Sequence, residues 1–446
     1  MAGSAPSSCF SCLLALLALT SSCGGGCNDK SSQQVAKADG GKGSDGAPAD
    51  ALQFSRDGRL YTQQLADIDE EIGKTEARAE SQPKSWLVLE KVAGLHLARA
   101  RLSGSYDDYA AAEDALKRAF ERAPEGSGPL LTRAALNFSL HRLDRMDADI
   151  DIVAGRAVLD DPTRARVEGL RGALAFERGQ YDLAKQHLDA ALALDRTATG
   201  IDRLALWHWR RGEFDQAETL YREAETMMGD EALESRAWTH LQLGLMDLDR
   251  GRHQEAFEHY RDGARILGGW WLIEEHVAEI AALLGHREQS LRLYAEIIAA
   301  TGKGEFMDAR AGLLLEDPSP EAQAEAKALI ERATAAYEVD IERFPEASYG
   351  HALEHFLEFG PAERALELAT ANHALRPGVP AKISLARARL GSNDVAGAKA
   401  VIDEALATAW RSADLFSVAA DVYERSGDAA KAGELRQQAK AIDASL

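Results

Sequence analysis

Cysteine is scarce in this chain and confined to one end of it. The 446 residues include four cysteines, and all of them precede residue 28: Cys9, Cys12, Cys23 and Cys27. The sequence beyond them can form neither a disulfide framework nor a thiolate metal site. Cys9 and Cys12 have the spacing of a redox or metal-binding pair. They fall in a segment that we expect processing to remove, so we interpret the spacing as coincidence.

Basic residues are few relative to acidic ones. Lysine and arginine number 51 against 72 aspartates and glutamates, which gives a formal net charge of −21. Binding to a nucleic-acid backbone requires clustered positive charge, so we expect no nucleic-acid partner. The acidic residues are interspersed with basic ones, as on a solvated surface. Their excess leaves a preference for basic partners as the alternative interpretation.

Signals for β-strands and for membrane-spanning helices are missing. No segment alternates β-branched and polar residues convincingly, so we expect no sheet. The apolar run of residues 10–19 is too short to cross a bilayer as a stable helix. Apolar residues instead recur with helical spacing, as at Ala184, Leu188 and Ala191. The sequence therefore predicts an all-α fold.

Motifs of known catalytic chemistry are absent, with one match to weigh. The segment 351–355 has the His-x-x-Glu-His order of one class of zinc peptidases. On a helix His351 and His355 share a face, and His373 is a candidate third ligand. The same segment is explained as the first helix of a repeat, which we favour. We expect no enzyme and no cofactor, with metal binding at these histidines as an alternative.

One pattern recurs from about residue 109 to the C-terminus. A glycine is followed by an aromatic or apolar residue two places on, then by alanine, a bulky residue and alanine at intervals of three, four and three. The glycine position is held by Gly179, Gly212, Gly251, Gly285, Gly360, Asn393 and Gly427. Successive spacings are 33, 39, 34, 75, 33 and 34 residues, and the longest has room for two units. This period indicates stacked helix pairs.

The residue types account for the pattern physically. A glycine ends the first helix, where a left-handed backbone costs least. The alanines stand where two helices approach closely. Because one helix pair cannot bury its apolar face alone, neighbouring pairs must stack into an array.

The pattern resembles the tetratricopeptide repeat (TPR) family, whose unit is a helix–turn–helix of roughly 34 residues. The resemblance covers most of residues 85–446 and implies a right-handed α-solenoid of about eight helix pairs. Residues 303–345 diverge from the pattern, and 319–344 is expected to be one long helix. Residues 53–84 are expected to form a capping helix, placed over about 58–80.

The N-terminal segment is similar to a bacterial lipoprotein signal. Its apolar run leads into Thr20, Ser21, Ser22 and Cys23, which implies cleavage and a lipid on Cys23. Residues 24–52 are rich in Gly, Ser, Asp and Lys and are expected to form a flexible tether. This implies an exported protein, lipid-anchored in a bacterial cell envelope at the outer membrane or in the periplasm. Simple secretion is the alternative.

In proteins of the TPR family the first helix of each pair faces a concave groove. The residues on the matching positions are Trp209, Arg210, Trp238, Glu275, Glu279, Glu354 and Arg387. The resemblance implies a non-catalytic scaffold that binds a peptide or protein partner there. Alternatives are an assembly factor for an envelope complex and an enzyme built from scattered residues. Trp207, Trp270 and Trp271 are expected to pack between helices.

Overall fold

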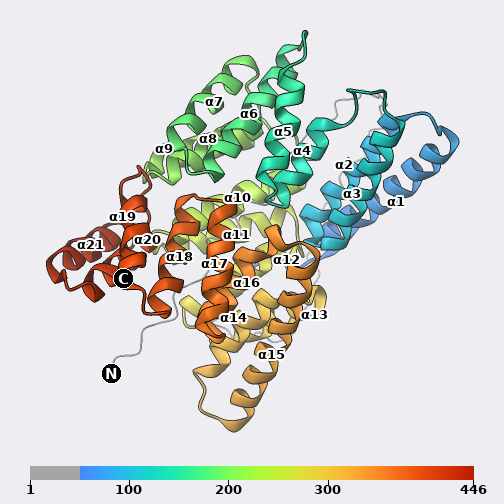
Figure 1. Ribbon diagram of the computed structural model, residues 1–446. Coiled ribbons are helices and arrows are strands. Elements are labelled where there is room, and N and C mark those ends of the chain that lie inside the picture. The colour runs from blue at the N-terminus through green and yellow to red at the C-terminus, as the bar shows by residue number, and fades with distance from the viewer. Residues whose placement is uncertain (1–50) are drawn as a thin grey trace.

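The computed structural model describes residues 51–446, which form 21 α-helices joined by short loops (Figure 1). No β-strand occurs in that part of the chain, as the all-α prediction requires. The helices are α1 (Arg59–Ser81), α2 (Trp86–Ser103), α3 (Tyr106–Arg122), α4 (Leu130–Ser139), α5 (Leu143–Ala154), α6 (Asp161–Glu177), α7 (Tyr181–Leu194), α8 (Ala198–Trp209), α9 (Phe214–Thr226), α10 (Leu233–Leu248), α11 (His253–Ile266), α12 (Trp271–Leu283), α13 (Arg287–Thr301), α14 (Gly304–Leu315), α15 (Pro320–Arg343), α16 (Pro345–Phe359), α17 (Ala362–Leu375), α18 (Val379–Gly391), α19 (Val395–Leu406), α20 (Ala413–Arg425) and α21 (Ala429–Ile442).

The helices pack as consecutive pairs in an α-solenoid. After α1, each even-numbered helix packs most extensively against the next one in the chain, which gives ten pairs within residues 51–446. The estimate of about eight pairs was therefore too low. The pair α4/α5 escaped the pattern because His141 stands at its turn where most units have glycine.

The turn within a pair places one residue in the left-handed region. Gly179, Gly212, Gly251, Gly285 and Gly427 have φ between 67° and 90°, which confirms the role expected of glycine. Two other residue types adopt the same conformation, Asn393 at φ 62° and His141 at φ 55°. Gly360 is an exception, because its φ of −110° and ψ of −179° are extended.

The long helix expected over 319–344 is α15, of 24 residues. Ser319 caps it by accepting a hydrogen bond from the Ala322 N–H (3.3 Å), and Pro320 occupies the first turn, where its missing N–H costs nothing. No glycine or proline interrupts the residues that follow. The helix therefore continues until it meets Phe344 and Pro345.

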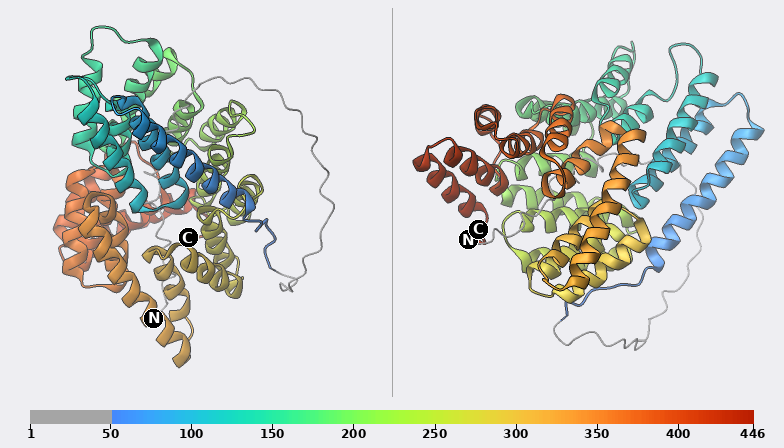
Figure 2. Two further views of the ribbon diagram at one scale, coloured as in Figure 1. Left: turned by 90° about the vertical axis from the view of Figure 1, so that its right-hand side faces the viewer. Right: turned by 60° about the horizontal axis from the view of Figure 1, so that its bottom comes forward.

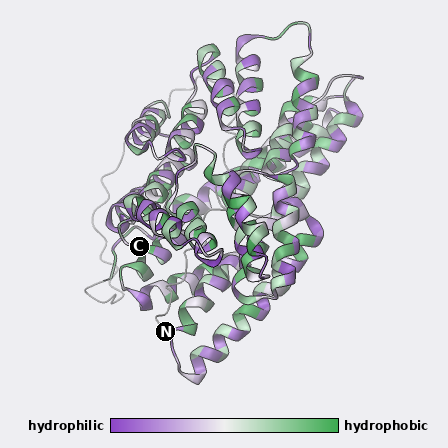
Figure 3. Cartoon of the chain, turned by 60° about the vertical axis from the view of Figure 1, so that its left-hand side comes forward, coloured by the Kyte–Doolittle hydropathy of each residue, from purple (hydrophilic) through white to green (hydrophobic). Residues whose placement is uncertain are grey.

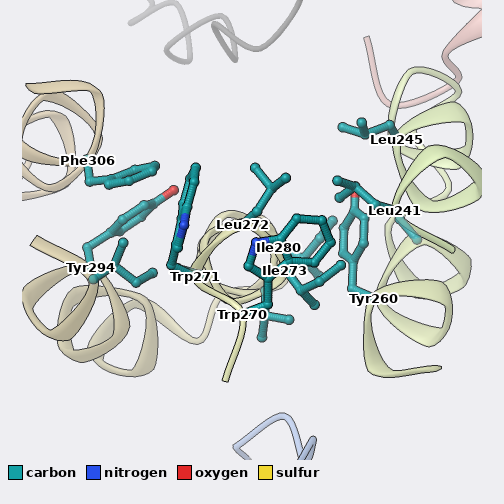
Figure 4. Close-up of a cluster of buried hydrophobic side chains, with 14 of the residues drawn as sticks. Leu241, Leu245, Tyr260, Trp270, Trp271, Leu272, Ile273, Ile280, Tyr294 and Phe306 are labelled. Carbon is teal, nitrogen blue, oxygen red and sulfur yellow. The ribbon is translucent and has the colours of Figure 1, made fainter. Parts of the chain in front are cut away.

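The helices carry both hydrophilic and hydrophobic residues (Figure 3). With helical spacing the hydrophobic residues gather on one side of a helix, which can then be buried. The largest group of buried side chains runs from α8 to α19 and includes Leu102 of α2. At its centre Trp271 lies near Phe306 and Tyr294, and Tyr260 faces Leu241 (Figure 4). Trp270, Trp271 and Trp207 are at most 7% exposed, which confirms that they pack between helices.

The array winds tightly enough for its C-terminal helices to rest on α4–α9 (Figure 1, Figure 2). Three hydrogen bonds join the two parts, which we call the seam: Arg376 Nη1 to His141 Nε2 (3.0 Å), Val379 N–H to Tyr181 Oη (2.9 Å) and Arg411 N–H to the Arg210 carbonyl (2.8 Å). The first helices of the pairs are thereby turned toward a confined interior. Within residues 51–446, no helix combines the length and apolarity needed to cross a bilayer.

Candidate interaction face

The concave face carries a charged cluster built from helices far apart in the sequence. Arg210, just after α8, binds Asp249, just after α10, with Nη1 and Oδ2 2.8 Å apart. The Arg210 guanidinium lies 4.0 Å from the centre of the Trp209 ring and 5.3 Å from that of Trp410. The aromatic rings and Asp249 together hold this arginine in one orientation.

A second charged group extends the cluster across the seam. Arg387 on α18 lies 3.4 Å from the carboxylate of Glu354 on α16, which also accepts a hydrogen bond from Ser384 (2.9 Å). Asp414 on α20 is within electrostatic reach of Arg387, Glu354 and both members of the Arg210–Asp249 pair. The five charged residues Arg210, Asp249, Glu354, Arg387 and Asp414 therefore form one cluster, which we call the concave cluster.

Burial sets the electrostatics of this cluster. It raises the pKa of Asp249 above its ordinary value, while the charge of Arg210 and hydrogen bonds from Arg210 and Trp209 lower it. It also raises the pKa of Asp414, which Arg387 lowers and Glu354 raises. The Asp249 side chain nevertheless keeps 36% of its surface accessible. Three carboxylates thus face two guanidinium groups, so the cluster favours additional positive charge.

A buried acidic group on α12 lies beside the cluster. His276 stands between Glu275 (3.1 Å from Nε2) and Glu279 (3.2 Å from Nδ1). Both oxygens of Glu275 lack a hydrogen-bond partner among the described residues. Burial, followed by the charges of Glu279 and Glu305, raises the pKa of Glu275 well above its ordinary value. Burial and the neighbouring carboxylates thus disfavour the charged form of Glu275.

The structure divides the residues expected in the groove into two sets. Trp209, Arg210, Glu275 and Glu279 are at most 6% exposed, because the winding of the array closes over them. These four side chains are therefore covered in the structure, and their role in partner binding stays a prediction. Trp238, Glu354 and Arg387 are only partly buried, and their role as contact residues stays a prediction.

Sequence reasoning missed Asp249 and Asp414. A signal for Asp249 was present, because it precedes Gly251 by two residues, as Arg210 precedes Gly212. Equivalent positions of successive repeats face the same surface, so the choice of Arg210 as a groove residue implied Asp249 as well. Asp414 had no such signal, since its approach to the cluster depends on the winding of the whole array.

Two of the three histidines considered as metal ligands, His351 and His355, have other partners. His355 Nδ1 lies 2.8 Å from Asp308, and its Nε2 lies 2.8 Å from the Thr334 hydroxyl. His351 Nδ1 lies 3.3 Å from Glu305. Across residues 51–446, no three His, Cys, Asp or Glu residues, His373 included, are grouped to hold a metal ion. The metal-binding alternative gains no support from this geometry.

Comparison with solved structures returns helical repeat proteins. The human IFIT1 dimer with m7Gppp-AAAA is 15% identical, with a TM-score of 0.42 over 84% of this chain and 95% of that chain. Yeast Tom70 is 13% identical, with a TM-score of 0.41 over 85% and 88%. A tetratricopeptide repeat protein from Parabacteroides merdae is 15% identical, with a TM-score of 0.33 over 55% and 93%. At TM-scores below 0.5, none of these likenesses bears on function.

Comparison at the level of sequence is more restricted. No curated protein matches the chain. One family model matches, that of the tetratricopeptide repeat, over residues 196–267. This stretch contains the helix pairs α8/α9 and α10/α11, whose ends carry Arg210 and Asp249. The chain is thus an all-α solenoid of TPR-like helix pairs, and its residues 196–267 are similar to the tetratricopeptide repeat.

Proposed function

We propose that this protein is a non-catalytic interaction scaffold that holds a basic segment of a partner protein against its concave face. The observation that carries the proposal is the concave cluster. Helices of separate repeat units bring three carboxylates and two arginines together there, and part of their surface stays accessible. A preformed, partly desolvated site with a net negative charge attracts and orients a cationic partner.

The proposed location is the bacterial cell envelope, with a lipid on Cys23 as the anchor. Support comes from the sequence alone, because Cys23 and all but the last two residues of the tether predicted over 24–52 lie outside the described residues. The last of them, Leu52, is hydrogen-bonded to Gln289 rather than free. Expression of the full chain in a bacterium with labelled fatty acid tests the anchor. Label on the wild type and none on Cys23→Ser is expected, whereas label on both proteins would contradict the assignment.

A pull-down from envelope extract tests the scaffold function. The baits are the full chain, the chain with Asp414→Lys, and the chain with Asp230→Lys as a matched charge reversal at a fully exposed site. We expect a partner with the first and third baits and its loss with the second. Equal recovery by all three would exclude the concave cluster as the binding surface.

A further inference from the structure

A groove outside the concave cluster adjoins a smaller, partly open cavity. The groove has a volume of about 860 Å³ and lies between the α2–α3 turn and helices α13 and α15. The cavity has a volume of about 60 Å³ and is lined from α2–α4, α12 and α14–α16. The two share the residues of a junction: Gly104, Tyr106, Trp271, Lys303 and Asp340. None of these belongs to the concave cluster.

The two volumes differ in what they can hold. A buried water needs roughly 10–15 Å³ of such cavity volume, so the cavity has room for about four to six heavy atoms. This is the size of a guanidinium group or of an ammonium group with its last methylenes. The groove is more than ten times larger and can take a stretch of extended chain. The shape therefore suits a peptide that inserts one side-chain tip.

The charges at the junction favour a cation. The carboxylates of Glu305 and Asp340 line the cavity together with two cationic side chains, Lys303 and Arg101. Lys303 Nζ is 3.8 Å from Glu305, whereas Arg101 is already paired with Glu234, which does not line the cavity, at 3.0 Å. Among the described residues, no hydrogen bond or ion pair within 4 Å engages the Asp340 carboxylate. Burial raises the pKa of Asp340, and Lys303 opposes this from longer range. Because Glu234 offsets the charge of Arg101, one incoming cation would neutralise the remaining excess carboxylate, whereas an acidic ligand would increase the excess.

Aromatic groups complete a site for a cationic tip. Lys303 Nζ lies 5.2 Å from the centre of the Trp271 ring, so the ring face already accepts a cation. The Trp271 indole is fixed from behind, because its N–H donates to the Leu102 carbonyl at 2.8 Å. The Tyr109 hydroxyl, on a residue 2% exposed, also lines the cavity. Ser139 lies near it, but no hydrogen bond of ordinary geometry joins the two hydroxyls.

We infer that the groove and cavity bind an extended basic segment of a partner protein, with one arginine or lysine side chain entering the cavity. Asp340 and Glu305 pair with the incoming cation, and the Tyr109 oxygen accepts one of its N–H groups. Lys303 is the internal cation that the incoming side chain displaces from the Trp271 face. This site extends the proposed scaffold function but does not depend on the concave cluster.

Calorimetric titration of the full chain tests the inference. The probes are acetyl-Ala-Ala-Arg-Ala-Ala-amide and the same peptide with citrulline, which keeps the shape of arginine and removes its charge. Both are titrated in the Asp414→Asn background, so that the concave cluster contributes little. We expect the arginine peptide to bind at least tenfold more tightly, because a charge-assisted hydrogen bond is lost with citrulline. Equal affinities would overturn the proposal without any further variant.

Three further substitutions in the same background locate the site. Asp340→Asn should weaken binding of the arginine peptide at least tenfold, and Lys303→Met should strengthen it by removing the competing ammonium. Glu331→Gln, the matched loss of an exposed charge on α15, should change nothing. Unchanged affinity in Asp340→Asn, or weaker binding in Lys303→Met, would contradict the assignment. If the concave cluster binds no partner, all of these results are still expected, because the groove and cavity do not include any of its residues.

Discussion

Ionising a single buried carboxyl group inside this array lowers the stability of the folded state. Asp202, on α8, has its pKa raised to about 7 by burial, with the charge of Arg203 lowering it. An unfolded aspartate titrates near pH 3.9. The folded state therefore binds this proton more tightly than the unfolded state. The stability contributed by the bound proton is complete at low pH and is lost as pH rises from about 4 to about 7.

Asp202→Asn should remove this pH dependence. The asparagine never ionises, so the variant should gain stability relative to the wild type as pH rises. The difference should grow to about 4 kcal/mol at pH 8, from the size of the pKa shift. Urea unfolding of both proteins at pH 5 and pH 8 measures it. Asp230→Asn, at an exposed position, should parallel the wild type, and a parallel profile for Asp202→Asn would refute the prediction.

Side-chain exposure was the part of the site that the sequence predicted least well. The repeat register placed Glu354 and Arg387 on a shared face, and they form an ion pair there. The same register could not reveal that Trp209 and Glu275 are covered. Burial at those positions depends on contacts with units far away in the chain. The pattern within one unit holds no information about those contacts.

At the scale of the helix pair, the turn between the two helices depends most on the residue with a left-handed backbone conformation. Gly427 has φ 90°, and a Cβ added there would meet no atom within 4 Å. Gly433, inside the neighbouring helix α21, is equally free of neighbours but is helical. The two glycines differ chiefly in backbone conformation, so they form a matched pair.

Gly427→Ala and Gly433→Ala should act in opposite directions. The first should destabilise the protein by about 1–2 kcal/mol, because alanine is strained in the left-handed region. The second should stabilise it by about 0.5–1 kcal/mol, because alanine is the better helix former. Thermal or urea unfolding of the two variants measures both effects. Equal effects from the two changes would show that the turn conformation does not matter for stability.

The sequence predicted the turn conformation correctly where the turn residue itself determines it. Five glycines with positive φ and Asn393 stand at the positions that the repeat indicated. The two exceptions have different causes, and one of them is a contact with a residue 235 positions away. His141 takes up the left-handed conformation and accepts a hydrogen bond from Arg376, so a non-glycine residue serves at that turn. Gly360 is followed by Pro361, and its turn is extended.

At the scale of the whole molecule, the seam fixes how tightly the array winds. The buried Tyr181 hydroxyl accepts the Val379 N–H and joins α7 to the start of α18. Pro377 and Gly378 also lie directly against the turn at Gly179. The pitch of the array is the sum of small rotations between pairs, and the pattern within one repeat does not specify it. This is why the closed interior could not be predicted from sequence.

Tyr181→Phe should loosen the seam. The change removes the acceptor of a buried N–H at the junction, which should cost about 1–3 kcal/mol in free energy of unfolding. Combined with Arg376→Ala it should also raise the radius of gyration measured by X-ray scattering. Tyr423→Phe, an exposed hydroxyl paired with Asp403, provides the control with little expected effect. An unchanged radius and an unchanged stability in the double variant would show that the seam does not hold the winding.

The net negative charge of the concave cluster is tested most directly by the affinity for a basic peptide. An acetylated, amidated peptide of alternating arginine and alanine is titrated calorimetrically into the full chain with Asp340→Asn, so that the outer cavity contributes little. We expect binding that weakens with salt and that falls at least tenfold with Asp414→Lys but not with Asp230→Lys. Affinity that is the same in both charge reversals would contradict the assignment of the concave cluster as the partner-binding surface.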